Sequence, residues 1–168
     1  GEPGDSPLHL VTFYGDSDMA GILIERGADI NAADNNGYTP LHYAAVNGQK
    51  ELGELFVEKG SKVNLHWIVF TGDKEVAEIL ISEGADLNKG PWGFTPLHVA
   101  AASGNLNMAG FLIEKGADLN IPTDEGETPL FYAAYSGNKE LAELLIEKGA
   151  DVNFKNNNGF TPLHWAVY

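Results

Sequence analysis

The chain has 168 residues, of which 43% are hydrophobic and 20% charged, a composition typical of a globular domain rather than a disordered or membrane-spanning chain. Its 24 acidic and 10 basic side chains give a net charge of −14, which disfavours nucleic-acid binding and favours a basic partner surface. The sequence has no cysteine, which excludes disulfides and thiolate metal sites, and no apolar run approaches the roughly 18 residues of a membrane span.

Two short motifs recur along the chain. The first, Thr-Pro-Leu-His, begins at Thr39, Thr95 and Thr161, with close variants beginning at Ser6 and Thr128. The second begins with a glycine that lies 18 residues after the histidine position of its own unit, at Gly27, Gly60, Gly84, Gly116 and Gly149. This register predicts one domain over residues 1–168, with repeats at about 5–36, 37–64, 65–92, 93–125 and 126–158 and a partial repeat at 159–168.

Each unit predicts two short helices and a polar turn. Thr39 is a good N-cap, and Pro40 suits the first helical position, where its missing N–H costs nothing. The first helix is expected to stop at Gly48, and a second helix with an apolar face follows it. The polar segment between the second helix and the next Thr-Pro is suited to an extended finger. The sequence therefore predicts a solenoid of helix pairs.

The third unit departs from this pattern. Asn31 and Leu41 are ten positions apart, but the equivalent Asn64 and Leu65 are adjacent, so about nine finger residues are missing. We expect a notch in the row of fingers, which is either neutral loop loss or a gap shaped for a partner. The same unit has Trp67 followed by Ile68-Val69 where others have an Ala-Ala pair, and this bulk could fill space that the missing finger leaves.

Two further departures from the repeat pattern lie beside the notch and in the sixth repeat. The finger at 89–94 is one residue short and carries Trp92, which we expect to be exposed. The sixth repeat has no second helix, so Leu163, Trp165 and Val167 should leave apolar surface open. We expect either a longer array or self-association through this end.

The same repeat register argues against a catalytic or metal site. The five histidines occupy equivalent positions, so stacking should separate them by roughly 8–10 Å, too far to share an ion, and we expect each to bond within its own turn. The repeated aspartates of the second motif are scaffold residues. We find no catalytic constellation and no phosphate loop, and expect neither enzymatic activity nor a cofactor.

The repeated Thr-Pro-Leu-His and Gly-Ala-Asp-x-Asn motifs resemble the ankyrin repeat family over nearly the whole chain from Asp5. The resemblance implies an all-α solenoid of stacked helix pairs with β-hairpin fingers, one of them missing near Asn64-Leu65. It also implies recognition of another protein on the concave face formed by fingers and first helices.

Contacts are then expected at finger positions and at the two residues before the first glycine of each unit. The finger positions include Asn35, Asn36, Tyr38, Trp92, Phe94, Asp124, Glu125 and Glu127. The helix positions are Phe13, Tyr14, Val46, Asn47, Phe70, Thr71, Ala102, Ser103, Tyr135 and Ser136.

This set is rich in aromatic side chains, which are either binding hot spots or pack onto neighbouring fingers; Tyr38 and Phe94, next to Thr-Pro, suit the second role best. The acidic finger Asp124 to Glu127 is either simply solvated or a contact for lysine or arginine. We expect a partner protein or peptide of mixed apolar and basic character, and neither nucleic acid nor membrane.

Four functions remain open: an interaction module, a targeting arm of a larger enzyme, channel or bacterial effector, an engineered binder, and an enzyme. The missing finger and scattered substitutions argue against an engineered consensus array. We expect a cytoplasmic protein, or one secreted into a host cell if it is a bacterial effector. In eukaryotic cytosol, Asn153 resembles the asparagines that are hydroxylated in ankyrin repeats.

Overall fold

A computed structural model describes residues 4–166, which form eleven α-helices, one short 3₁₀ helix and no strand. The helices are α1 (Pro7–Tyr14), α2 (Ser17–Glu25), α3 (Pro40–Val46), α4 (Lys50–Glu58), α5 (Leu65–Thr71), α6 (Lys74–Ser82), η1 (Pro91–Gly93), α7 (Pro96–Ala102), α8 (Leu106–Glu114), α9 (Pro129–Tyr135), α10 (Lys139–Glu147) and α11 (Pro162–Trp165). Each complete repeat contributes one pair, and α11 is the first helix of the sixth.

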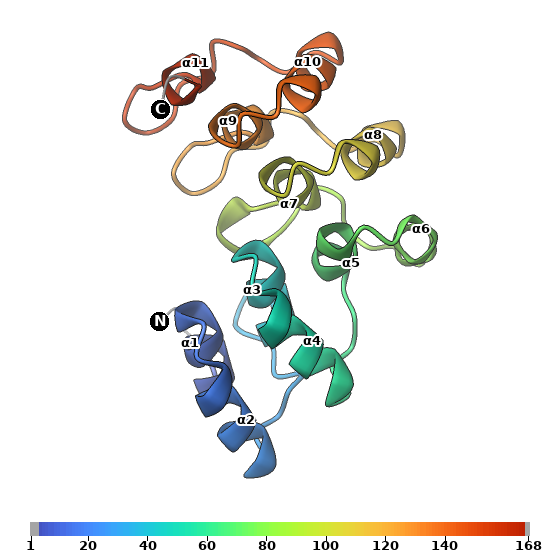
Figure 1. Cartoon of the computed structure of the whole chain (residues 1–168), viewed down its shortest axis with the longest axis vertical. Coiled ribbons are helices and arrows are strands. Elements are labelled where there is room, and N and C mark those ends of the chain that lie inside the picture. The colour runs from blue at the N-terminus through green and yellow to red at the C-terminus, as the bar shows by residue number, and fades with distance from the viewer. Residues whose placement is uncertain (1–3, 167–168) are drawn as a thin grey trace.

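The helix pairs stack into a solenoid. The first helices contact one another in the order α1, α3, α5, α7, α9 and α11, and in the outer row α2 contacts α4 and α8 contacts α10. In Figure 1, α7 and α9 lie between loops on the left and the second helices α8 and α10 on the right. Helices α5 to α10 are seen nearly end-on, whereas α1 to α4 lie closer to the plane of the view. The helix direction therefore changes between the second and third repeats.

The helix ends follow the sequence signals. Thr39 precedes Pro40 with an extended backbone, and Gly15 closes α1 in the left-handed conformation at φ 74°. Second helices begin at side-chain caps, as where the Asn138 carboxamide oxygen accepts a hydrogen bond from the Leu141 N–H at 3.0 Å. Leu141 itself is fully buried. These local signals agree with the stacking, which explains why the repeat register could be predicted.

The fingers are tight turns rather than paired strands. Each of three is closed by two backbone hydrogen bonds. The first runs from the N–H of Asp34 to Tyr38 at 2.9 Å, from Thr123 to Glu127 at 2.8 Å, and from Asn156 to Phe160 at 2.9 Å. In the second, the N–H of the turn glycine donates back to the carbonyl of Asp34, Thr123 or Asn156. The described residues contain no strand beside these turns. The hairpin shape is thus present without a β-ladder.

The missing finger is confirmed. Residues 59–64 connect α4 directly to α5, and Asn64 replaces the usual threonine as the N-cap. Its side-chain oxygen accepts a hydrogen bond from the backbone N–H of Trp67 at 2.9 Å. A helix-to-helix connection of this length needs no finger.

Trp67 fills a different space from the one we expected. Its side chain is 4% exposed and packs against Gly53 of the preceding outer helix, α4, where an added Cβ would overlap the indole ring. The other four complete repeats have alanine at the position of Gly53, namely Ala20, Ala77, Ala109 and Ala142. A small residue in α4 and a large one in α5 therefore compensate each other, and Trp67 does not occupy the place of the missing finger.

Candidate functional site

The histidines are structural connectors. The backbone N–H of Ser6 donates to Nδ1 of His9 at 3.0 Å, so the opposite nitrogen carries the proton and donates to the Tyr38 carbonyl at 2.9 Å. The same pattern joins His98 to Thr95 and to the Glu127 carbonyl. Each such histidine fixes its own turn, as the sequence predicts, and also ties its helix to the next finger, which the sequence pattern did not predict.

One histidine pair lies closer than the expected 8–10 Å. The rings of His42 and His66 are 5.4 Å apart between centroids, because the finger that would separate them is missing. Burial lowers the pKa of His42 to about 4 and that of His66 to about 3, so both are neutral near pH 7. Within residues 4–166, no group of three or more histidine, aspartate or glutamate side chains is arranged to hold a metal ion.

The remaining fingers are joined to one another. The Asp124 N–H donates to the Trp92 carbonyl at 2.9 Å, and the Asn157 N–H donates to the Glu125 carbonyl at 3.0 Å. Across the notch, η1 of the third-repeat finger contacts α3 of the second repeat. A Cβ at Gly90 would overlap the Phe94 carbonyl and the His66 ring, so this short finger requires glycine there. The finger at 89–94 therefore lies directly against the second repeat.

Trp92 is half-buried, not exposed as the sequence suggested. Its backbone adopts φ 54°, the one positive φ of a non-glycine residue among residues 4–166. The indole packs edge-on to Tyr43, with ring centroids 4.5 Å apart, and lies 5.9 Å from the Phe13 ring. The missing finger gives the indole access to these two rings, which belong to the first and second repeats.

These contacts border a cavity of about 490 Å³ on the concave face, hereafter the notch cavity. Seven of the predicted contact residues line it: Phe13, Tyr14, Val46, Asn47, Trp92, Phe94 and Glu125. Five lining residues were not predicted: Asp5, Leu10, Tyr43, Thr123 and Tyr132. A tyrosine directly after the Leu-His or Leu-Phe of the first helix marks Tyr43 and Tyr132, and that repeated position could have identified them.

Two acidic residues, Asp5 and Glu125, are among those that line the notch cavity. The Tyr43 hydroxyl lies 3.0 Å from an Asp34 oxygen and 3.1 Å from an Asp5 oxygen. Burial, followed by the hydrogen bond to Asp34, raises the Tyr43 pKa above its ordinary value. Burial and the charges of Glu127 and Glu125 raise the pKa of Tyr132. No lysine, arginine or histidine is among the residues that line the cavity.

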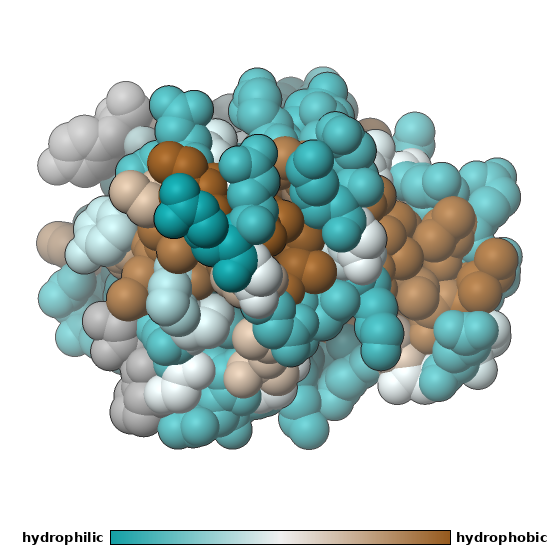
Figure 2. Space-filling model, turned by 90° about the horizontal axis from the view of Figure 1, so that it is seen from below, coloured by the Kyte–Doolittle hydropathy of each residue, from teal (hydrophilic) through white to brown (hydrophobic). Residues whose placement is uncertain are grey.

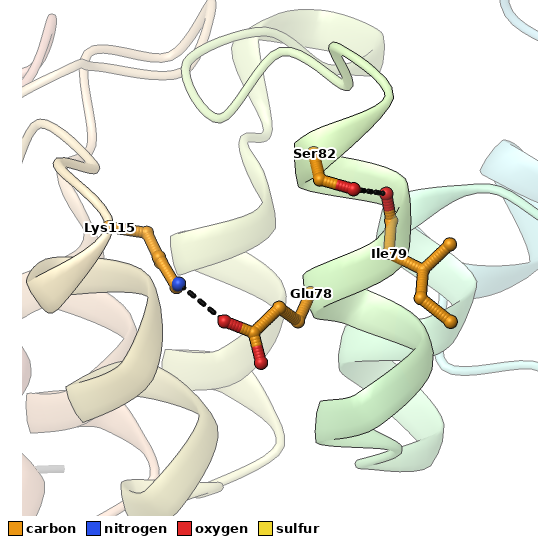
Figure 3. A network of polar contacts seen from close by, with 4 residues as sticks. All are labelled: Glu78, Ile79, Ser82 and Lys115. Carbon is orange, nitrogen blue, oxygen red and sulfur yellow. Dashed lines mark hydrogen bonds and ion pairs between the residues drawn. The ribbon is translucent and has the colours of Figure 1, made fainter.

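Several basic side chains are instead held on the outer helices. In Figure 3 the Lys115 ammonium bonds Glu78 of α6 at 2.6 Å, beside the hydrogen bond from Ser82 to the Ile79 carbonyl. The hydrogen bond from Lys115 lowers the Glu78 pKa. Lys50 pairs with Glu54 within α4, and Lys139 pairs with Glu143 within α10. These lysines are not among the residues that line the notch cavity.

The other predicted residues spread along the concave face. Phe70, Ala102 and Ser103 line a smaller hollow of about 210 Å³ that shares Val46 and Asn47 with the notch cavity. Tyr135 borders a third hollow with Phe160, His164 and Trp165. The rest line none of these three hollows: Asn35, Asn36, Thr71, Asp124 and Ser136 are exposed, and Tyr38 and Glu127 are half-buried.

Phe94 is 8% exposed, and its ring packs against Tyr132 with centroids 4.8 Å apart. Tyr38 lies against His42, with ring centroids 5.6 Å apart. Both aromatics therefore pack into the scaffold while remaining close to the concave face. Asn153 is exposed, and its N–H donates to Asp151 at 2.9 Å.

Both ends of the described stack present apolar side chains. Figure 2 looks at the end formed by α1 and α2 and shows hydrophobic surface among hydrophilic residues. Met19 and Ile22 of α2 are 42% and 47% exposed. At the other end Leu163 is 72% exposed beside a groove of about 490 Å³ between α9, α10 and α11. Trp165 is half-buried against Tyr135, and Val167 lies outside the described residues.

The stacked helix pairs, joined fingers and recurring histidine bonds define a helical repeat protein. A family model described as ankyrin repeats (3 copies) matches residues 2–65, and one described as ankyrin repeats (many copies) matches 65–113, 97–146 and 130–168. The chain belongs to the ankyrin repeat family, whose members are general protein–protein interaction modules.

Two curated relatives match locally. The chain is 52% identical over 40 residues to an ankyrin repeat-containing protein of Schizosaccharomyces pombe, a match that covers 24% of this chain and 19% of that protein. It is 47% identical over 38 residues to an ankyrin repeat protein of Fowlpox virus, covering 23% of this chain and 20% of that protein. The matches thus span about a fifth of each relative's length.

None of the helices within residues 4–166 is long and apolar enough to cross a membrane.

Proposed function

We propose that this chain binds a partner protein or peptide along its concave face, with the notch cavity as the centre of the contact. The observation that carries the proposal is the gathering of Phe13, Tyr14, Val46 and Trp92 from three different repeats around one hollow. Phe13 and Tyr14 remain 53% and 79% exposed there. Large aromatic side chains that stay partly exposed around a hollow are typical anchors of a protein interface.

The partner surface combines apolar and basic groups. Apolar groups match the aromatic walls, and basic groups match Asp5 and Glu125 of the lining. The protein needs no catalytic machinery or cofactor for this role. We propose that it acts in the cytoplasm, or in a host cell if it is a bacterial effector.

The first experiment identifies the partner. The intact chain is used as bait at low and at moderate salt, and captured proteins are identified by mass spectrometry. Affinity is then measured for the purified partner with the parent chain and with the combined variant Phe70→Ala, Trp92→Ala and Tyr135→Ala, one change in each hollow. We expect the dissociation constant to rise by more than about tenfold.

A matched control carries Val57→Ala and Ile79→Ala, which truncate exposed aliphatic side chains of the outer helices α4 and α6. Its affinity should stay within about twofold of the parent. Equal melting temperatures of the variants would show that the scaffold is intact. Unchanged affinity of the concave-face variant would refute the proposal.

A second candidate role is that of a targeting arm within a larger enzyme, channel or effector. It is favoured by the local character of the matches, which cover about a fifth of each relative. The full-length coding sequence decides between the two, because a catalytic or channel domain would be visible there.

A further inference from the structure

The junction between the second and third repeats is held together differently from the junctions on either side of it. We propose that this junction is a hinge of the solenoid, and that the indole of Trp92 is the latch that fixes its angle. Three features support this: the bonds that the junction lacks, the packing that it keeps, and the strained backbone of Trp92.

Histidine bonds between repeats are missing at this junction. At three other junctions a histidine ring nitrogen of the first helix is hydrogen-bonded to a backbone carbonyl of the next finger: His9 to Tyr38, His66 to Phe94 and His98 to Glu127. Within residues 4–166, His42 of the second repeat makes no such bond, because the finger that would supply the carbonyl is missing. Its ring is still bonded to Thr39 through Nδ1.

Turn asparagines form a second set of bonds between repeats, and this set is also interrupted. Their side-chain oxygens accept hydrogen bonds from backbone N–H groups of the next turn: Asn31 from Lys62 at 2.8 Å, Asn88 from Asp118 at 2.9 Å and Asn120 from Asp151 at 2.8 Å. Asn64 stands at the equivalent position of the second repeat, but its oxygen accepts from the Trp67 N–H because it is the N-cap of α5. The lost finger therefore removes both recurring bonds from one junction.

Helix packing still holds the second and third repeats together. Helix α5 contacts α3, and Trp67 of α5 packs against Gly53 of α4. Apolar packing is not directional, and packed helices can tilt or slide by small amounts, as in hinge and shear motions. The change of helix direction in Figure 1 lies at this same junction. The junction therefore has a pivot but lacks the bonds that fix the angle at its neighbours.

The finger at 89–94 spans this junction. The indole of Trp92 packs edge-on against Tyr43 of the second repeat and lies 5.9 Å from the Phe13 ring of the first. The Trp92 carbonyl accepts a hydrogen bond from the Asp124 N–H of the fourth-repeat finger at 2.9 Å. In the same finger, the Gly90 backbone interacts with the phenol of Tyr38. Trp92 thus links the first two repeats to the third and fourth.

The backbone of Trp92 is strained while it makes these contacts. Its φ of 54° lies in the left-handed region, which bulky residues rarely adopt, whereas Gly93 takes a φ of 74° without a steric cost. Such a conformation persists only where the surrounding contacts outweigh the strain. The contacts with Tyr43 and Phe13 therefore hold the finger, and removing the indole should release both the strain and the hinge angle.

The hinge angle also sets the width of the notch cavity. Phe13 and Val46 line the cavity from the first two repeats, and Thr123 and Tyr132 line it from the fourth and fifth. A rotation at the junction moves these two groups of residues relative to each other. Trp92, which lines the same cavity, therefore keeps it at one width.

The test measures distances between pairs of spin labels by double electron–electron resonance. Because the chain has no cysteine, each pair needs only two substitutions. Glu51→Cys with Asn107→Cys places labels on α4 and α8, across the proposed hinge. Glu75→Cys with Glu140→Cys places them at the equivalent positions of α6 and α10, so this control pair also spans two junctions but not the hinge. All four residues are exposed.

We expect a narrow distance distribution for both pairs in the parent. Trp92→Gly should widen the α4–α8 distribution by at least about twofold and leave the α6–α10 distribution unchanged. Phe13→Ala, which truncates a ring that is 53% exposed, should widen the α4–α8 distribution partway. Trp92→Phe keeps a ring against Tyr43 and should stay close to the parent. Asn158→Gly, the same change at the equivalent position of the last finger, should affect neither pair.

Three results would overturn the hinge and its latch. They are an α4–α8 distribution that is as wide in the parent as in Trp92→Gly, an unchanged distribution in that variant, and equal widening of both label pairs. Thermal unfolding followed by circular dichroism shows whether each variant is folded. If Trp92→Gly does not fold, Phe13→Ala decides, because an unchanged width in that variant would rule out the latch.

These distances are measured without a partner, so the hinge and the proposed function are tested separately. A rigid junction combined with weaker partner binding by the concave-face variant would remove the hinge and leave the interaction role. A widened distribution combined with unchanged partner affinity would refute the interaction role and leave the hinge.

Discussion

Replacing Gly53 by alanine should destabilise the protein, although the same change usually stabilises a helix. Alanine is favoured over glycine within a helix by about 1 kcal/mol. At Gly53, however, the added Cβ would overlap the six-membered ring of the buried Trp67, which is 4% exposed and has little room to move. Forcing an extra methyl into a packed core costs typically about 1–3 kcal/mol. We expect Gly53→Ala to lower the free energy of unfolding by roughly 1 kcal/mol, a fall of about 2–4 °C in melting temperature.

Gly21 is the matched control. It also lies inside an outer helix, α2, but a Cβ there would meet no atom within 4 Å. Gly21→Ala should therefore stabilise the protein by about 0.5–1 kcal/mol. Thermal unfolding followed by circular dichroism measures both variants.

The compensation between Gly53 and Trp67 can be measured directly. Trp67→Val, which places in α5 the residue that α7 has at Val99, leaves a cavity and should cost about 3 kcal/mol. Adding Gly53→Ala to it should cost less than the sum of the two single changes, by about 1–3 kcal/mol. A Gly53→Ala variant as stable as the Gly21→Ala variant, or strictly additive effects, would refute this packing argument.

Three further predictions concern pH, the missing finger and the open end. Burial lowers the pKa values of His42 and His66 to about 4 and about 3, so the unfolded chain takes up protons first as the pH falls through about 6.5. Stability should then be constant above that pH and decline below it, by at most about 2 kcal/mol per buried histidine at pH 5, and equal melting temperatures at pH 7 and pH 5 would contradict this. Inserting a copy of residues 32–40, which contain the first finger and its Thr-Pro, between Asn64 and Leu65 should weaken partner binding by roughly tenfold or more, whereas unchanged affinity would show neutral loop loss. The 72% exposed Leu163 should support self-association at high concentration, so sedimentation should show a larger mass for the parent than for Leu163→Glu, and a monomeric parent at every concentration would exclude it.

Most of the fold could be predicted from the repeat register of the sequence. The cap at Thr39, the stop at Gly48 and the buried face of α10 are local signals. The other complete repeats have equivalent signals, although the third repeat has Asn64 in place of the threonine. The missing finger could also be predicted, because counting positions between equivalent residues requires no knowledge of packing. What counting could not show is how the neighbouring segments rearrange around the gap.

That rearrangement depends on contacts between repeats. The approach of His42 to His66 and the burial of Trp92 both follow from the lost spacing, and neither is visible in a single repeat. The fit of Trp67 against Gly53 needs the register of two helices at once. The list of concave positions therefore included Trp92 and Phe13 but missed Tyr43, whose position in the repeat resembles a scaffold residue.

The most direct test of the interaction role is hydrogen–deuterium exchange of the intact chain with and without its captured partner. The account predicts that the partner slows exchange at the ends of α1 and α3 and in the fingers at 89–94 and 123–127, which border the notch cavity. The outer helices α4, α6 and α8 should exchange at unchanged rates. Protection confined to those outer helices, with the notch cavity unaffected, would contradict it.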